Sequence, residues 1–174
     1  MKKFEEFIEF SSPILDDFKN NFDALKEEAN NAYLNDLFIE WINTQLYESG
    51  WSAIGFKYEG VTFINEILIN TLPTLYSLFE KHNDVLYSLA FSNFEANTII
   101  KPHFDRLHPH NIIRCHLGIK IPNGDCKLKV NGIEREWKLG EFLIFDDAFE
   151  HEAWNKTDNN RIVLLIDLFR DRVL

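Results

Sequence analysis

Residues 112–132 read IIRCHLGIKIPNGDCKLKVNG, and this stretch decides the expected fold class. Two runs of mainly aliphatic residues, 112–121 and the start of 126–137, have the length and composition of β-strands. The pairs Asn123-Gly124 and Asn131-Gly132 favour the two-residue turns of β-hairpins, because both positions of such a turn need positive φ. We therefore expect at least two hairpins in this part of the chain.

The same pattern of short strands and turns extends in both directions from this stretch. The segments predicted as strands are 85–94, 98–101, 112–121, 126–137, 142–145, 151–155 and 161–169. Many short strands separated by Gly and Asn turns indicate a sandwich, barrel or jelly roll. We predict a mostly β protein with N-terminal helices, built as a double-stranded β-helix of the jelly-roll, cupin-like type.

The residues before this β-rich part are predicted to be mainly helical. Residues 16–41 place apolar side chains at helical spacing, with a break expected near Asn30-Asn31. Residues 51–58 have the pattern of a strand, and Pro73 lies in the first turn of a short helix over 71–80. With 174 residues, the chain is expected to form one domain, in which residues 1–84 support a β core of residues 85–174.

Charge and composition limit the expected partners. The formal net charge of −10 repels phosphate backbones and anionic lipid, so neither nucleic acid nor a membrane is expected to bind. The first residues carry acids where a signal peptide has an apolar run, and no apolar run is long enough to span a bilayer, so a cytoplasmic location is predicted. Cys115 and Cys126 are expected to be reduced thiols. Nothing in the sequence predicts an oligomeric state.

A set of metal-binding residue types lies within the β-rich part. His103 and Asp105 are two residues apart, so an extended segment presents both side chains on one face. His151 follows after enough chain for a later strand to return beside them. Two imidazoles and one carboxylate leave three positions of a metal open, as in non-haem Fe(II) oxygenases. With 6 histidines in the chain, the same spacing also fits residues that bind no metal.

Arg161 follows His151 at the start of an apolar strand. An arginine in this position is either a solvated charge at a strand end or a buried group. A buried guanidinium grips a carboxylate with two hydrogen bonds. Position alone does not separate these two hypotheses.

At these residues the chain resembles the aspartyl/asparaginyl β-hydroxylase family of Fe(II)- and 2-oxoglutarate-dependent dioxygenases. The likeness extends from Ser92 to Arg170, and the order and spacing of its motifs agree with the family. The motifs are KPHFD at 101–105, RCHLGI at 114–119 with Pro122, LGE at 139–141, FDDAFEHEAWN at 145–155, and Arg161 with Asp167.

The resemblance implies a role for each matching residue. His103 and His151 correspond to the iron ligands, and Arg161 to the residue that binds the distal carboxylate of 2-oxoglutarate. Some family members carry a glycine at the position of Asp105, whereas the carboxylate here favours a complete triad. Further co-substrate contacts are implied for Ser92, Arg114 and His116.

The resemblance also implies an enzyme that uses Fe(II), 2-oxoglutarate and O₂ to hydroxylate a small molecule or a peptide. The favoured reaction is β-hydroxylation of Asp or Asn, in a peptide or as a free or carrier-tethered amino acid. Hydroxylation of a lipid acyl chain is the alternative within the family. An acidic substrate needs local cations, which Lys101, Arg106 and Arg114 are placed in sequence to provide.

Two other hypotheses stay open. The chain fits a non-catalytic cupin-like module that binds a small acid or sugar, and a zinc protein, because His and Asp also bind Zn²⁺. Asp146 and Asp147 are candidates to orient a ligand ring from the second coordination shell. Trp51 and Trp137 are expected in the core.

Overall fold

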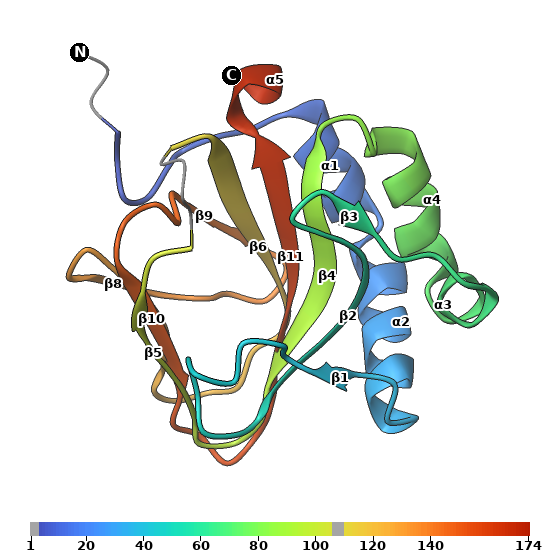
Figure 1. The fold of residues 1–174 in the computed structure, drawn as a ribbon. Helices are drawn as coiled ribbons and strands as arrows, with labels where there is room; N and C mark the ends of the chain where they lie inside the picture. The colour runs from blue at the N-terminus through green and yellow to red at the C-terminus, as the bar shows by residue number, and fades with distance from the viewer. Residues whose placement is uncertain (1–3, 106–109) are drawn as a thin grey trace.

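Two antiparallel β-sheets face each other in the computed structural model, which describes residues 4–105 and 110–174. The larger sheet has seven strands in the order β1-β2-β4-β11-β6-β9, with β3 paired to β2, and the smaller sheet has the order β5-β10-β7-β8. Helices cover the outer face of the larger sheet (Figure 1). The strands are β1 (Ile39–Glu40), β2 (Trp51–Tyr58), β3 (Val61–Thr62), β4 (Leu86–Phe94), β5 (Thr98–His103), β6 (Ile112–Lys120), β7 (Cys126–Val130), β8 (Ile133–Glu136), β9 (Phe142–Phe145), β10 (His151–Asn155) and β11 (Arg161–Phe169).

The chain crosses between the two sheets repeatedly as it runs from β4 to β11. Strands β4, β6, β9 and β11 lie in the larger sheet, and β5, β7, β8 and β10 lie in the smaller one. This winding is that of a double-stranded β-helix, and it confirms the predicted fold class.

One of the two predicted hairpins is present and the other is not. Asn131 and Gly132, with φ of 46° and 83°, form the tight turn between β7 and β8. The prediction for Asn123-Gly124 was wrong, because this turn leads from β6 to β7 in the opposite sheet. Both edges of β6 are already paired, with β11 and β9, so β7 has no edge of β6 to join.

The helices precede the β-helix, apart from the short C-terminal α5 (Arg170–Val173). The long helical stretch predicted over 16–41 is two helices that break at Asn21 and not near Asn30-Asn31. Its last part was predicted wrongly, because α2 ends at Leu34 and Ile39–Glu40 forms β1. Asn21 has non-helical ψ, and its side chain donates to the Asp17 carbonyl, which ends the first helix. The remaining helices are α1 (Pro13–Asn20), α2 (Phe22–Leu34), α3 (Glu66–Thr71) and α4 (Pro73–His82). Among the described residues, no helix is long and apolar enough to cross a membrane.

Successive residues of the central strands face two different cores. In β11, Ile162, Leu164 and Ile166 pack against the helices, whereas Val163 packs between the two sheets. The period of two residues then turns Arg161 toward the space between the sheets as well. The cavity there is lined by residues of β4, β6 and β11, among them Ser92 and His116. The side of the larger sheet that faces the smaller sheet is therefore partly polar, whereas in most sandwiches this side is apolar. Both cysteines are free thiols, as predicted, and both are buried.

Glu28 of α2 caps the beginning of α4. Its carboxylate accepts from the backbone N–H groups of Thr74 at 2.5 Å and Leu75 at 3.1 Å, where the N-cap residue Leu72 supplies no side-chain acceptor. We expect Glu28→Ala to lower the free energy of unfolding by about 1–2 kcal/mol, the effect of losing a helix cap. Urea denaturation measures this, with the exposed neighbour Glu27→Ala as control. Equal losses in both variants would contradict the capping role.

Candidate metal centre

His103 and His151 lie opposite each other on neighbouring strands. His103 ends β5, His151 begins β10, and the two residues are paired in the antiparallel register. The Nδ1 atom of His103 lies 2.7 Å from the Lys101 carbonyl, and that of His151 lies 2.9 Å from the Phe149 carbonyl. Because a carbonyl only accepts, each Nδ1 carries the proton. Both Nε2 atoms therefore present a lone pair.

The Asp105 carboxylate lies beside these two lone pairs. Its Oδ1 is 3.2 Å from Nε2 of His103, and its Oδ2 is 3.6 Å from Nε2 of His151. One ligand atom from each of the three residues lies within 4.8 Å of the others. Burial alone would raise the pKa of Asp105, but the positive charge of Arg114 holds it well below its ordinary value. The three residues thus offer two neutral nitrogens and one anionic oxygen to a single point.

Arg114 of β6 lies behind Asp105 and is surrounded by carboxylates. It bonds to Asp105 through Nη1 and to Asp167 through Nε at 2.8 Å and Nη2 at 3.0 Å, and Nη2 is also 3.1 Å from Asp147. Although burial opposes its charge, Asp167, Asp147 and Asp105 raise the pKa of Arg114 well above its usual range. Three carboxylates around one guanidinium leave an excess of negative charge, which a divalent cation would balance.

Arg161 is a buried cation with a different environment. Only 1% of its surface is exposed, and its guanidinium carbon lies 3.4 Å from the ring centroid of Phe94 and 4.7 Å from that of Trp137. Nη1 donates to the Ser92 carbonyl at 3.1 Å, while Nε has no hydrogen-bond partner among the residues that the structure describes. Within 4–105 and 110–174, no carboxylate forms an ion pair with it, and burial lowers its pKa. A buried charge of this kind is costly unless an anion joins it.

His116 and Ser92 add two further donors to the same cavity. Trp137 Nε1 donates to Nδ1 of His116 at 3.2 Å, and Nε2 of His116 is buried with no hydrogen-bond partner in the described part of the chain. Burial, together with the charges of Arg114 and Arg161, holds the pKa of His116 well below its ordinary value, so the ring is neutral. The Ser92 hydroxyl accepts from Trp51 Nε1 at 3.1 Å, which leaves its own hydrogen available.

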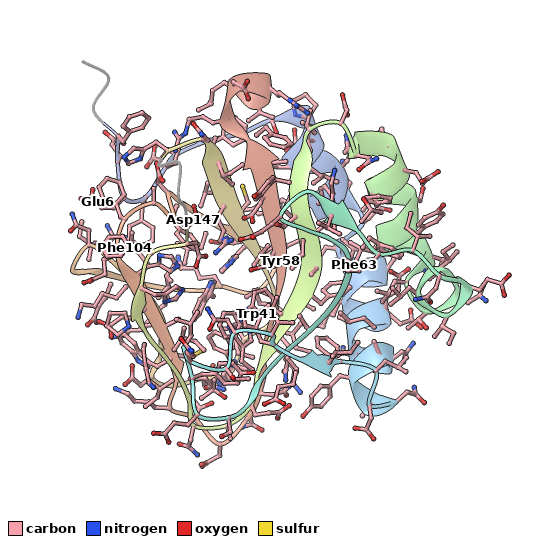
Figure 2. The ribbon with its side chains drawn as sticks, in the orientation of Figure 1. Glu6, Trp41, Tyr58, Phe63, Phe104 and Asp147 are labelled. Atoms are coloured by element: carbon pink, nitrogen blue, oxygen red, sulfur yellow. The ribbon has the colours of Figure 1, made fainter. Side chains whose placement is uncertain are left out.

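The cavity brings together all seven predicted site residues. Trp41 and Tyr58 also line it, and Figure 2 shows both in front of the space between the sheets, with Phe104 beside β5. Of the cations suggested for an acidic substrate, Arg106 lies outside the described residues, and Lys101 donates to the Gln45 carbonyl at 3.4 Å.

The sequence did not reveal the partners of these residues. Trp137 is buried as expected for a core residue, but it also contacts His116 and Arg161, and Trp51 is only partly buried. Asp167 was noted only as part of a motif, yet it faces Arg114 directly across β11 and β6. Asp146 bonds to Arg170 at 2.6 Å and to His110 at 2.8 Å. Pairing across strands far apart in sequence is the information that was missing.

Comparisons with known proteins identify the family and the fold. The family model for aspartyl/asparaginyl beta-hydroxylase matches residues 19–171. The aspartyl/asparaginyl beta-hydroxylase of Homo sapiens is 31% identical over 152 residues, which are 84% of this chain and 19% of that protein. The ornithine lipid ester-linked acyl 2-hydroxylase of Rhizobium tropici is 41% identical over 88 residues, 49% of this chain and 30% of that protein. The matched part is thus less than a third of these curated relatives.

A solved structure shares the fold. The prolyl hydroxylase of Trichoplax adhaerens, in complex with a fragment of the hypoxia inducible factor oxygen degradation domain, superposes with a TM-score of 0.59 at 11% identity, over 88% of this chain and 80% of that one. The family match, by contrast, rests on sequence and covers α2, α3 and α4 as well as the β-helix. The chain therefore belongs to the aspartyl/asparaginyl beta-hydroxylase family.

Proposed function

We propose that this protein is an Fe(II)- and 2-oxoglutarate-dependent hydroxylase in which His103, Asp105 and His151 hold the iron. The ligand types fit Fe(II), because two imidazoles and one carboxylate on one side leave three positions open. The observation that carries the proposal is the neighbouring Arg161, a buried guanidinium that forms no ion pair with any described carboxylate. A metal site beside an anion site is what a chelating dicarboxylate requires.

The donors of the cavity fit 2-oxoglutarate. Arg161 would bind the distal carboxylate, because its guanidinium provides parallel donors and lacks an anionic partner within the described chain. Ser92 and His116, which line the same cavity, would add a hydroxyl and an imidazole N–H. A buried N–H without an acceptor is costly, and a ligand carboxylate would remove that cost.

The chain's own residues would orient the reactants and exclude water. When bound together, Fe(II), 2-oxoglutarate and O₂ supply the oxidising chemistry, with succinate and CO₂ as co-products. The carbonyls of Lys101 and Phe149 fix the two imidazole rings, and Arg114 fixes one oxygen of Asp105. Trp41 and Tyr58 would shield the centre at its opening.

The proposed substrate is an Asp or Asn, in a peptide or as a free or carrier-tethered amino acid, hydroxylated at the β-carbon. The human relative that aligns with 84% of this chain bears the name of that activity. A lipid acyl chain is the second candidate, since the Rhizobium tropici relative is named for it and Trp41, Trp51 and Tyr58 give the cavity opening an apolar wall.

The test is a succinate-release screen with Fe(II), 2-oxoglutarate and O₂ over amino acids, Asp- and Asn-containing peptides, and acyl lipids. We expect succinate to rise above the uncoupled background in one arm, and anaerobic Fe(II) with 2-oxoglutarate to give a weak visible charge-transfer band. Absence of both the band and succinate would refute the proposal and favour a binding module or a zinc site.

A further inference from the structure

Trp137 is a buried indole that contacts two of the proposed co-substrate residues at once. It lies directly after β8 and is 3% exposed. Its ring is stacked with that of His116, with centroids 6.1 Å apart and an interplanar angle of 27°, and it faces the Arg161 guanidinium at 4.7 Å. It offers neither a charge nor an acceptor to a ligand, because an indole N–H only donates.

The hydrogen bond from Trp137 determines which nitrogen of His116 carries the proton. Nε1 of Trp137 can only donate, so Nδ1 of His116, 3.2 Å away, must accept. A neutral imidazole that accepts at Nδ1 is protonated at Nε2. Nε2 is the buried atom for which the described residues provide no hydrogen-bond partner. The indole therefore turns His116 into a donor toward the cavity.

Without this bond, the opposite tautomer would present a lone pair to the ligand. A lone pair on Nε2 repels a carboxylate oxygen, whereas an N–H on Nε2 binds it. The tautomer of His116 therefore decides whether the ring attracts or repels a ligand carboxylate. The same indole also contacts the Arg161 guanidinium, which lies closer to the ring of Phe94. The contacts of the guanidinium with these two aromatic rings are favourable cation–π interactions.

We propose that Trp137 is a positioning residue for the co-substrate: it holds His116 in the Nε2–H tautomer and so makes it a donor to a carboxylate of 2-oxoglutarate. This inference rests on the proposed function. It assigns Trp137 no contact with the reacting atoms. It predicts that Trp137 acts on 2-oxoglutarate binding through His116.

The first measurement needs no ligand. Two-bond proton–nitrogen NMR spectra of the apoprotein should show His116 as the Nε2–H tautomer, and Trp137→Phe should give a mixture of tautomers while keeping an aromatic ring in place. A His116 protonated at Nδ1 in the unmodified protein would overturn the proposal, even if the variant failed to fold.

The second measurement is the dissociation constant of 2-oxoglutarate with the metal bound. Trp137→Phe should raise it about 2- to 10-fold, the effect of one hydrogen bond, and should leave metal affinity unchanged. In a His116→Leu background the same substitution should have no further effect, because the two residues act as one unit. Additive effects in the double variant would overturn the proposal.

A surface indole provides the matched control. Trp154 donates through Nε1 to Asp125 at 2.7 Å, so Trp154→Phe also removes an indole hydrogen bond and should change neither the tautomer nor 2-oxoglutarate binding. If the unmodified protein shows the Nε2–H tautomer but does not bind 2-oxoglutarate, the proposed function fails and the action of Trp137 on His116 stands.

Discussion

Replacing His151 with alanine is expected to abolish succinate formation and the charge-transfer band of Fe(II) with 2-oxoglutarate. His151 would supply one of three protein ligands, and its Nε2 lies 3.6 Å from Asp105. Loss of an outer-shell partner of a metal ligand typically weakens binding about 10- to 100-fold, so loss of the ligand itself should exceed about 100-fold. Metal affinity is measured anaerobically with Fe(II).

The control for this variant is His82→Ala. His82 lies near the C-terminal end of α4, where its Nε2 is 2.8 Å from Asp17, and it does not line the cavity. Its loss should leave iron binding unchanged. Unaltered Fe(II) affinity in His151→Ala, with the fold intact by circular dichroism, would remove this residue from the metal centre.

Replacing Arg161 with methionine is expected to weaken 2-oxoglutarate binding by about 2–5 kcal/mol, or roughly 30- to several-thousand-fold, the usual cost of truncating one partner of a buried ion pair. The protein itself should not lose stability, because a desolvated guanidinium with no described ion pair is replaced by an apolar side chain of similar length. Titration with 2-oxoglutarate in the presence of Mn²⁺ and a urea unfolding curve measure the two effects.

Arg161→Lys separates charge from geometry. Lysine keeps the charge but lacks the planar fork, so binding should recover only in part. An Arg161→Met protein that binds 2-oxoglutarate within threefold of the unmodified one would exclude Arg161 as the anion site. A protein that loses binding and stability together would indicate a structural role.

Much of this site could be predicted because strand periodicity is local. The strand predicted over 161–169 is β11, and its period of two residues places Arg161 on the face opposite the helix-covered side chains Ile162 and Leu164, although the sequence alone did not show that Arg161 is buried. The spacing of His103 and Asp105 predicted a shared face, and their ligand atoms do meet, although Asp105 lies two residues beyond the end of β5.

The parts that failed depend on contacts between distant segments. The Asn123-Gly124 turn has the composition of a hairpin, but the strand before it is already paired on both edges. Asn30-Asn31 was expected to break a helix, whereas it lies inside α2, because the weak helix propensity of two asparagines is overridden by burial of the neighbouring Ala29 and Ala32. The indole of Trp137 looked like ordinary core, since no local pattern shows what its N–H meets.

The proposed metal ligands and co-substrate residues come from opposite sheets. His103 and His151 lie on β5 and β10 of the smaller sheet, whereas Ser92, His116 and Arg161 lie on β4, β6 and β11 of the larger one. The distance between the proposed metal site and the proposed anion site is thus the spacing between the two sheets, which is set by apolar side chains between them such as Ile100, Leu128 and Val163. Adding or removing one methylene in this apolar layer would change the spacing between the sheets. It would thereby change how well a five-carbon diacid spans the two proposed sites, although the altered side chain contacts neither site.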